Sequence, residues 1–210
     1  MRKKMPEKID LRKRHKQLYA ATRRVVEVDS PRGTFLAVEG RGERGGPAFQ
    51  AAIETLYSVG YTLKWSLKMS GVLDFGVPCL ECLYTSADME AAPPKEWAWT
   101  FLLRIPDEVT AREVSAARAQ VKQRRGLDTA DVKRRKLREG RCLQTLHVGP
   151  YGDVGPVYER LNAHAAANGL QVSGPPHEVY VNDPRRVPPE KVKTVVRLPV
   201  KRGASTARKR

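Results

Sequence analysis

Apolar residues follow a strand-like and then a helix-like pattern in the first half of the chain. Residues 25–40 are rich in β-branched and aromatic types and run into a glycine cluster, which predicts a strand followed by a loop. Pro47 opens a predicted helix that runs to about Leu67, because apolar residues recur there at helical spacing. Two more predicted strands, 77–85 and 97–105, complete the order strand, helix, strand, strand.

The second half repeats this order after an intervening helix, predicted over residues 107–123. Basic residues at 122–125 and 133–138 are interpreted as a solvated linker. The elements that follow are a predicted strand at 141–148, a glycine-bounded loop, a helix at 156–168, and strands at 177–183 and 192–200.

Short motifs confirm that the two halves correspond. Gly46-Pro47-Ala48-Phe49 recurs 109 residues later as Gly155-Pro156-Val157-Tyr158, and Leu103-Arg104-Ile105-Pro106 recurs 93 residues later as Val196-Arg197-Leu198-Pro199. Duplicated units that pack together create a groove between them. We therefore expect an α+β fold in which duplicated strand-helix-strand-strand modules form a pseudo-twofold antiparallel sheet with helices on one face.

Charge divides the chain into a body and two basic ends. The net charge is +16, and eleven of these charges lie in the ends: residues 1–16 hold eight basic and two acidic residues, and residues 201–210 hold five basic residues and no acid. We expect tails at 1–16 and 201–210 around one domain at 17–200, with repeats at about 25–106 and 141–200. Polybasic ends can attach to phosphate without sequence readout, so an alternative function is binding through these tails, either to nucleic acid or to an enzyme that acts on nucleic acid.

Cysteine usage indicates a reducing compartment. Three cysteines are too few for a disulfide framework, and the chain shows no secretory signal or long apolar run, so we expect a cytoplasmic protein with no membrane segment. Cys79 and Cys82 form a C-x-x-C pair, but the pair lies in a predicted strand without a second ligand pair. We expect no metal and no cofactor.

An acid and a phenol share one face of the predicted strand 177–183. Alternation places Glu178 and Tyr180 on that face and His177 on the other. Glu81 occupies the corresponding strand of the first repeat, 97 residues earlier, so two carboxylates could face a shared groove. The alternative for each is a solvent-facing strand residue. Tyr151 lies in a glycine-bounded turn that could aim it into the same groove.

Aromatic side chains are the remaining candidates for ligand contact. Trp97 and Trp99 share a strand face that Phe101 and Leu103 continue, so the tryptophans either line the groove or belong to the core. Tyr57 and Tyr61 on the predicted helix 47–67 join this set. A groove that binds flat or cationic molecules needs π-faces together with a buried acid.

These stretches resemble a known family. The sequences at 51–64, 97–100, 147–151, 177–186 and 189–197 are similar to those of the GyrI-like small-molecule-binding proteins, which are related to effector domains of multidrug-responsive transcription regulators. The resemblance covers about residues 10–200. It implies two strand-helix-strand modules with a ligand cleft between them, a central acid at Glu178 accompanied by Tyr180, and aromatic walls at Trp97 and Trp99.

The resemblance also implies an activity, because some standalone members are similar enough to indicate hydrolytic opening of cyclopropane rings in DNA-alkylating natural products. The leading hypothesis is a small-molecule-binding protein for hydrophobic aromatic or cationic compounds, with hydrolase activity as an extension. In the enzymatic version Glu178 is the general base, and Tyr151 or Tyr180 donates a proton to the substrate. Leu83-Tyr84-Thr85 departs from the family's usual aromatic pair.

Overall fold

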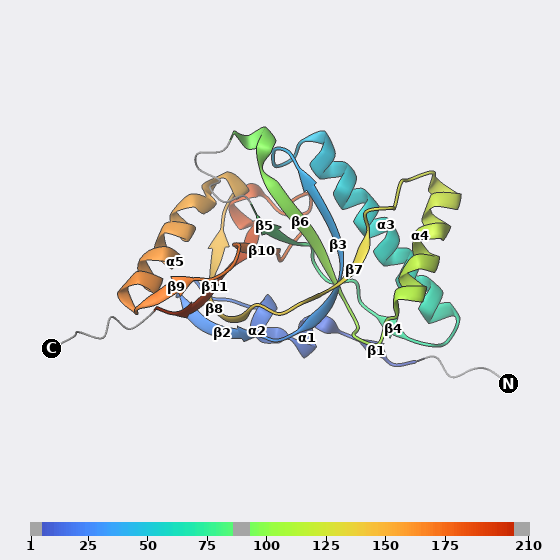
Figure 1. Ribbon diagram of the computed structural model, residues 1–210, viewed down its shortest axis with the longest axis horizontal. Helices are drawn as coiled ribbons and strands as arrows, with labels where there is room; N and C mark the ends of the chain where they lie inside the picture. The colour runs from blue at the N-terminus through green and yellow to red at the C-terminus, as the bar shows by residue number, and fades with distance from the viewer. Residues whose placement is uncertain (1–5, 86–92, 204–210) are drawn as a thin grey trace.

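The computed structural model describes residues 6–85 and 93–203, and Figure 1 shows these as a curved sheet with helices beside it. The strands are β1 (Lys8–Ile9), β2 (Val26–Ser30), β3 (Gly33–Arg41), β4 (Asp74–Phe75), β5 (Glu81–Tyr84), β6 (Ala98–Ile105), β7 (Lys133–Leu137), β8 (Gly140–Val148), β9 (Leu170–Val172), β10 (His177–Tyr180) and β11 (Lys193–Arg202). The α-helices are α1 (Leu11–Arg14), α2 (Lys16–Tyr19), α3 (Pro47–Met69), α4 (Ala111–Arg125) and α5 (Gly155–Ala167). Short 3-10 turns are η1 (Pro94–Glu96), η2 (Tyr151–Val154) and η3 (Pro189–Lys191).

The sheet confirms the predicted duplication. Its strand order is β2-β8-β11-β10-β5-β6-β3-β7, with β9 paired to β11. The first repeat is β3-α3-β5-β6 and the second is β8-α5-β10-β11. The two repeats are related by a pseudo-twofold axis that passes between the central antiparallel strands β5 and β10. The expected α+β fold with pseudo-twofold symmetry is therefore confirmed.

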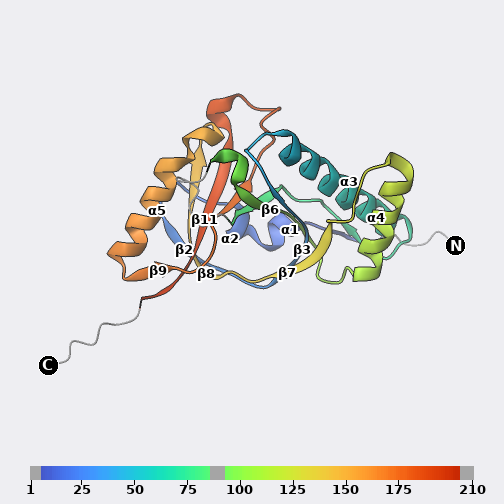
Figure 2. The same cartoon turned by 45° about the horizontal axis from the view of Figure 1, so that its top comes forward.

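The two long repeat helices cover the same face of the sheet, as expected. Leu56 and Leu63 of α3 pack in one cluster with Phe101 of β6, and Leu161 of α5 packs in another with Val196 of β11. Strand register places Phe101 and Val196 on that one face. Figures 1 and 2 show α3 and α5 apart, at opposite ends of the sheet, with α4 beside α3. Because each helix covers its own repeat, the face at the central strand pair is left for other side chains.

The N-terminal segment corrects the expected domain boundary. From Lys8 onward it is part of the fold: β1 pairs with β4, Leu11 is only 3% exposed within the first core cluster, and Leu18 packs against Val179 and Val195. The sequence predicts a tail up to residue 16 because charged residues surround the apolar Leu11 on both sides. The C-terminal boundary also moves slightly, since β11 continues to Arg202. Residues 1–5 and 204–210 lie outside the described residues.

Two further expectations about local structure are wrong. Residues 25–40 form two strands, β2 and β3, because Pro31 and Arg32 interrupt them. The basic stretch 133–138, interpreted as a linker, contains β7, which pairs with β3 at the edge of the sheet. Charged side chains are typical of exposed edge strands, where they oppose pairing with other chains. Within the described residues, no helix is long and apolar enough to cross a membrane.

Candidate functional site

Glu178 lies on β10 at the centre of the sheet, between the two repeats, and its side chain is completely buried. Three groups donate hydrogen bonds to its carboxylate. Arg44 Nη2 lies 2.9 Å from Oε1 and Arg44 Nη1 lies 3.1 Å from Oε2, while the hydroxyl of Tyr158 lies 2.6 Å from Oε1. A buried carboxylate is tolerated only when it is paired and hydrogen-bonded in this way.

Four tyrosines surround this ion pair. The Tyr84 and Tyr180 hydroxyls lie 3.1 Å apart across the central strand pair, and the rings of Tyr151 and Tyr180 meet edge to face at 5.2 Å. The Arg44 guanidinium carbon lies 4.9 Å from the centre of the Tyr84 ring and 5.7 Å from that of Tyr151. Together with Tyr158, these residues form what we call the tyrosine cage: Tyr84, Tyr151, Tyr158 and Tyr180 around Glu178.

Elements of both repeats build the cage. Tyr84 and Tyr180 come from the central strands β5 and β10, Tyr151 from η2, and Tyr158 from the first half of α5. Tyr158 stands 109 residues after Phe49, which packs edge to face on Trp99 and Phe101 in the core. The same repeat position is therefore core in one half and a hydrogen-bond donor in the other.

A glycine-rich turn between β3 and α3 positions Arg44. Gly42 and Gly45 have φ values of 131° and 80°, a region that favours glycine, and they bracket Arg44 so that the chain can turn back over the sheet. The turn is fixed at its start because the indole Nε1 of Trp99 donates to the Gly42 carbonyl at 3.1 Å, and the Gly42 N–H donates to the Trp97 carbonyl at 3.0 Å. Arg44 thus reaches Glu178 from an anchored loop.

The electrostatics of the cage favour protonated phenols. Burial, together with the negative charge of Glu178, raises the pKa of Tyr158 and of Tyr180 well above the usual value for tyrosine. Burial also raises the pKa of Tyr84 and Tyr151. Burial works to lower the pKa of Arg44, but Glu178 outweighs it and raises that pKa. At neutral pH the cage therefore offers hydroxyl donors and a guanidinium cation around one carboxylate.

Glu81 does not share this site, which corrects the expectation of two facing carboxylates. Strand pairing sets Cys82 opposite Glu178 and sets Glu81 opposite Val179, so Glu81 points to the other face of the sheet. There Tyr19 donates to Glu81 at 2.7 Å, and His177 Nε2 lies 3.1 Å from its carboxylate. Residues on the same face of these two strands, such as Tyr84 and Tyr180, are 96 residues apart. Glu81 and Glu178 are 97 residues apart, and a shift of one residue places a side chain on the opposite face.

Glu81 belongs instead to a buried charge cluster on the face of the sheet that contacts Tyr19 of α2. His177 Nδ1 lies 2.9 Å from Glu139, and Arg197 Nη1 lies 2.7 Å from the other oxygen of Glu139. Burial works to lower the pKa of His177, but Glu139 and Glu81 outweigh it and raise that pKa to about 9. With His177 protonated, two cations and two carboxylates balance in this cluster.

The other aromatic candidates occupy supporting places. Trp99 is 2% exposed, packs on Phe49 and Phe101, and lies so close to Gly40 that a side chain there would collide with the indole. It is a core residue that anchors the Arg44 loop, while Trp97 is half-buried just before β6. Tyr57 and Tyr61 stack on each other at 6.1 Å on α3, and Tyr61 is 49% exposed. Ligand contact by Trp97, Tyr57 and Tyr61 stays a prediction.

Sequence reasoning missed three members of the site: Arg44, Tyr84 and Tyr158. The repeat itself held a signal for Tyr158, because it is the aromatic residue of the duplicated Gly-Pro motif. Tyr84 lies on the same strand face as Cys82, the residue paired with Glu178. In the sequence, Tyr84 stands out only as part of the segment that departs from the family's aromatic pair. No local pattern marks Arg44, whose partner is 134 residues away.

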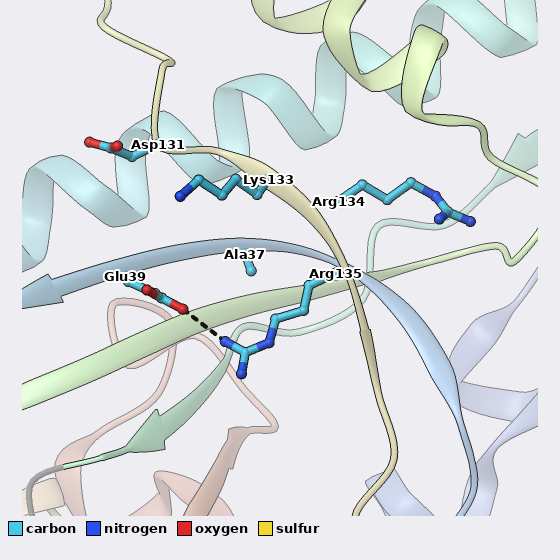
Figure 3. A pocket seen from close by; sticks show the side chains of 6 residues that line it. All are labelled: Ala37, Glu39, Asp131, Lys133, Arg134 and Arg135. Atoms are coloured by element: carbon cyan, nitrogen blue, oxygen red, sulfur yellow. Dashed lines mark hydrogen bonds and ion pairs between the residues drawn. The ribbon is translucent and has the colours of Figure 1, made fainter.

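A surface hollow elsewhere is lined by Ala37, Glu39, Asp131, Lys133, Arg134 and Arg135 (Figure 3). Its arginines already have partners, since Arg135 pairs with Glu39 at 2.9 Å and Arg134 donates to the Val109 carbonyl at 2.7 Å. The tyrosine cage around Glu178 is therefore the better candidate for a functional site than this hollow. Among the described residues, no group of histidine, cysteine and acidic side chains could hold a metal ion.

Fold and site together define a small-molecule-binding domain made of two repeats. The model of the family described as "GyrI-like small molecule binding domain" matches residues 43–201, and the chain belongs to this family. Among curated proteins, none matches the chain.

Several solved structures are similar to the whole chain. A protein from Listeria innocua whose title calls it a hydrolase is 34% identical, with a TM-score of 0.84 over 93% of this chain and 100% of that one. A Listeria innocua protein described as an uncharacterized conserved protein is 35% identical, with a TM-score of 0.85 over 92% of this chain and 100% of that one. The C-terminal domain of EcmrR, at 13% identity and a TM-score of 0.59 over 85% of this chain and 98% of that one, shares the fold alone.

Proposed function

We propose that the protein binds hydrophobic aromatic compounds at the tyrosine cage and hydrolyses those that carry an activated cyclopropane ring. One observation carries this proposal: a completely buried carboxylate, Glu178, lies at the junction of the repeats among phenol donors. Buried acids with specific charged partners, placed between repeats, are typical of functional sites. The proposal is also supported by the relative titled a hydrolase, which is 34% identical over nearly the full chain.

The reaction is an addition of water to a cyclopropane conjugated with a carbonyl. The water oxygen forms a bond to a ring carbon, and the ring carbon–carbon bond breaks with its electrons moving towards the carbonyl oxygen. Glu178 accepts the water proton, and a protonated phenol, Tyr151 or Tyr180, delivers a proton to the carbonyl oxygen. Both phenols keep their protons at neutral pH, so each is available to donate to the carbonyl oxygen as that oxygen gains charge.

The test combines binding and turnover in oxygen-18 water with an electrophilic cyclopropane compound. We expect a ring-opened alcohol that carries the label, with the rate reduced about 100-fold to 10,000-fold in Glu178→Gln or Tyr180→Phe. Glu159→Gln is the matched control, since Glu159 is an exposed glutamate on α5. If the wild-type protein binds the compound and releases it unchanged, the function reduces to sequestration. If it does not bind such compounds at all, the assignment of the site is wrong.

Two parts of the functional picture stay predictions. Cysteine usage supports a cytoplasmic location, since Cys79, Cys82 and Cys142 are free thiols. The basic ends support nonspecific contact with nucleic acid, which would hold the protein near DNA when its ligand is a DNA alkylator. Binding of cationic compounds depends on Arg44, because this side chain already pairs with the carboxylate of Glu178.

A further inference from the structure

We propose that Arg44 determines the ligand specificity of the cage: its guanidinium occupies the position of a ligand cation, so the protein selects neutral, carbonyl-bearing aromatic compounds over lipophilic cations. This inference rests on the proposed function and names its ligand class. In this chain, therefore, the site around Glu178 should prefer neutral ligands to cationic ones.

The geometry of Arg44 is that of a bound organic cation. Two nitrogens reach the two oxygens of Glu178 at 2.9 and 3.1 Å, and the guanidinium carbon lies within 5.7 Å of the ring centres of Tyr84 and Tyr151. A carboxylate combined with aromatic faces is what a site offers to a cationic ligand. Here a side chain of the protein already uses both.

The charge balance makes a second cation unfavourable. Glu178 and Arg44 neutralise each other, and Tyr158 donates a further bond to the same carboxylate. A cation entering the cage would either lie beside Arg44, whose charge already balances that of Glu178, or have to displace a bidentate ion pair. Breaking such a pair leaves a buried charge without its partner, which is strongly unfavourable.

A neutral ligand with a carbonyl oxygen can bind without breaking the ion pair between Arg44 and Glu178, because hydrogen-bond donors are left over. A guanidinium carries five N–H donors, of which Glu178 uses two, and the Arg44 side chain is 21% exposed. The hydroxyls of Tyr151 and Tyr180 lie in the same cage and keep their protons. The cage therefore holds donors for a neutral acceptor atom, and the rings of Tyr151 and Tyr180 provide apolar surface beside them.

The repeat indicates that this cation is a feature of one half only. The position 109 residues after Arg44 is Asp153, an exposed residue of η2. The loop that carries Arg44 is built to hold it, through two glycines with positive φ and through the bonds of Gly42 to Trp99 and Trp97. The second repeat therefore has an acid at the position that corresponds to Arg44, and the cation that pairs with Glu178 comes from the first repeat.

The test compares a cation and a neutral probe of similar shape, tetraphenylphosphonium and triphenylphosphine oxide, by calorimetric titration of the full chain. We expect the wild-type protein to bind the oxide at least about tenfold more tightly. Arg44→Met keeps a similar side-chain length without the charge, and it should raise the affinity for the cation by at least about tenfold. Arg41→Met is the matched control, because Arg41 is an exposed arginine at the end of β3, and it should behave as wild type.

A double variant protects the test against misfolding. Arg44→Met combined with Glu178→Gln leaves no unpaired buried charge. We expect it to lose the gain in cation affinity and to bind the oxide more weakly than the wild-type protein, because the guanidinium donors are gone. The inference is overturned if the wild-type protein binds both probes equally, or if Arg44→Met leaves the ratio of affinities unchanged. If no variant binds either probe, the inference is also overturned, because the cage then accepts neither class of ligand. The proposed function is judged separately by the oxygen-18 test with the cyclopropane compound, so the two failures are distinct.

Discussion

Replacing His177 by glutamine should remove a pH dependence of stability that the buried charge cluster creates. His177 faces Glu81 of β5, Arg197 of β11, and Glu139, which precedes β8. Its pKa is raised to about 9 in the folded protein, against 6.5 for the ordinary imidazole. The folded state therefore holds a proton that the unfolded chain has lost over this interval, and the stability it confers is full below pH 6.5 and lost as pH rises through about 9.

The magnitude follows from the two pKa values. One pKa unit corresponds to about 1.4 kcal/mol, so the interval from 6.5 to about 9 corresponds to about 3 kcal/mol in all. Between about pH 7 and pH 8.5 the free energy of unfolding should fall by about 2 kcal/mol. Cysteines of the unfolded chain begin to ionise at the top of this window, at about pH 8.5, and the raised pKa values of Cys79, Cys82 and Cys142 in the folded protein add to the fall. This contribution is the same with and without His177, so the difference in slope between the wild-type protein and His177→Gln measures the share of His177.

Urea unfolding followed by circular dichroism at a series of pH values measures this slope. His177→Gln should reduce this slope, while His164→Gln, a change at a half-buried position of α5, should keep it. Equal slopes in the wild-type protein and His177→Gln would refute the reasoning. A wild-type stability that is constant between about pH 7 and pH 8.5 would also refute it, because the cluster would then hold a neutral imidazole.

Two further predictions concern the ends of the chain. Leu11→Ala should lower the free energy of unfolding by about 2–5 kcal/mol in urea titrations, because the buried Leu11 fills the core, whereas the control Val26→Ala at a 40% exposed position should have little effect. Deleting residues 1–5 and 204–210, which hold six basic residues, should reduce the salt dependence of DNA binding by up to about 5 in log–log slope and leave small-molecule binding intact. An unchanged slope would place the DNA-binding charge in the body.

The repeat architecture could be predicted because it is written in contiguous residues. Strand alternation, helical spacing and the recurring Gly-Pro motif are local patterns, and the constant offset between halves specifies the duplication. The same alternation placed Glu178 and Tyr180 together on one strand face, where the structure has them beside Tyr151. Local periodicity determines which side chains share a face within one strand.

Register and long-range pairing were decided only by the tertiary structure. Glu81 lies on the opposite face from Glu178 because the pairing of β5 with β10 sets Cys82 opposite Glu178, and an offset of one residue reverses every side chain. Arg44 meets its carboxylate across 134 residues because the turn between β3 and α3 brings it to β10, a central strand of the sheet. No local sequence pattern predicts the partner of a charged residue in a loop. The partner of Arg44 is determined by how the two repeats pack together, because this packing brings the loop of the first repeat next to Glu178 of the second.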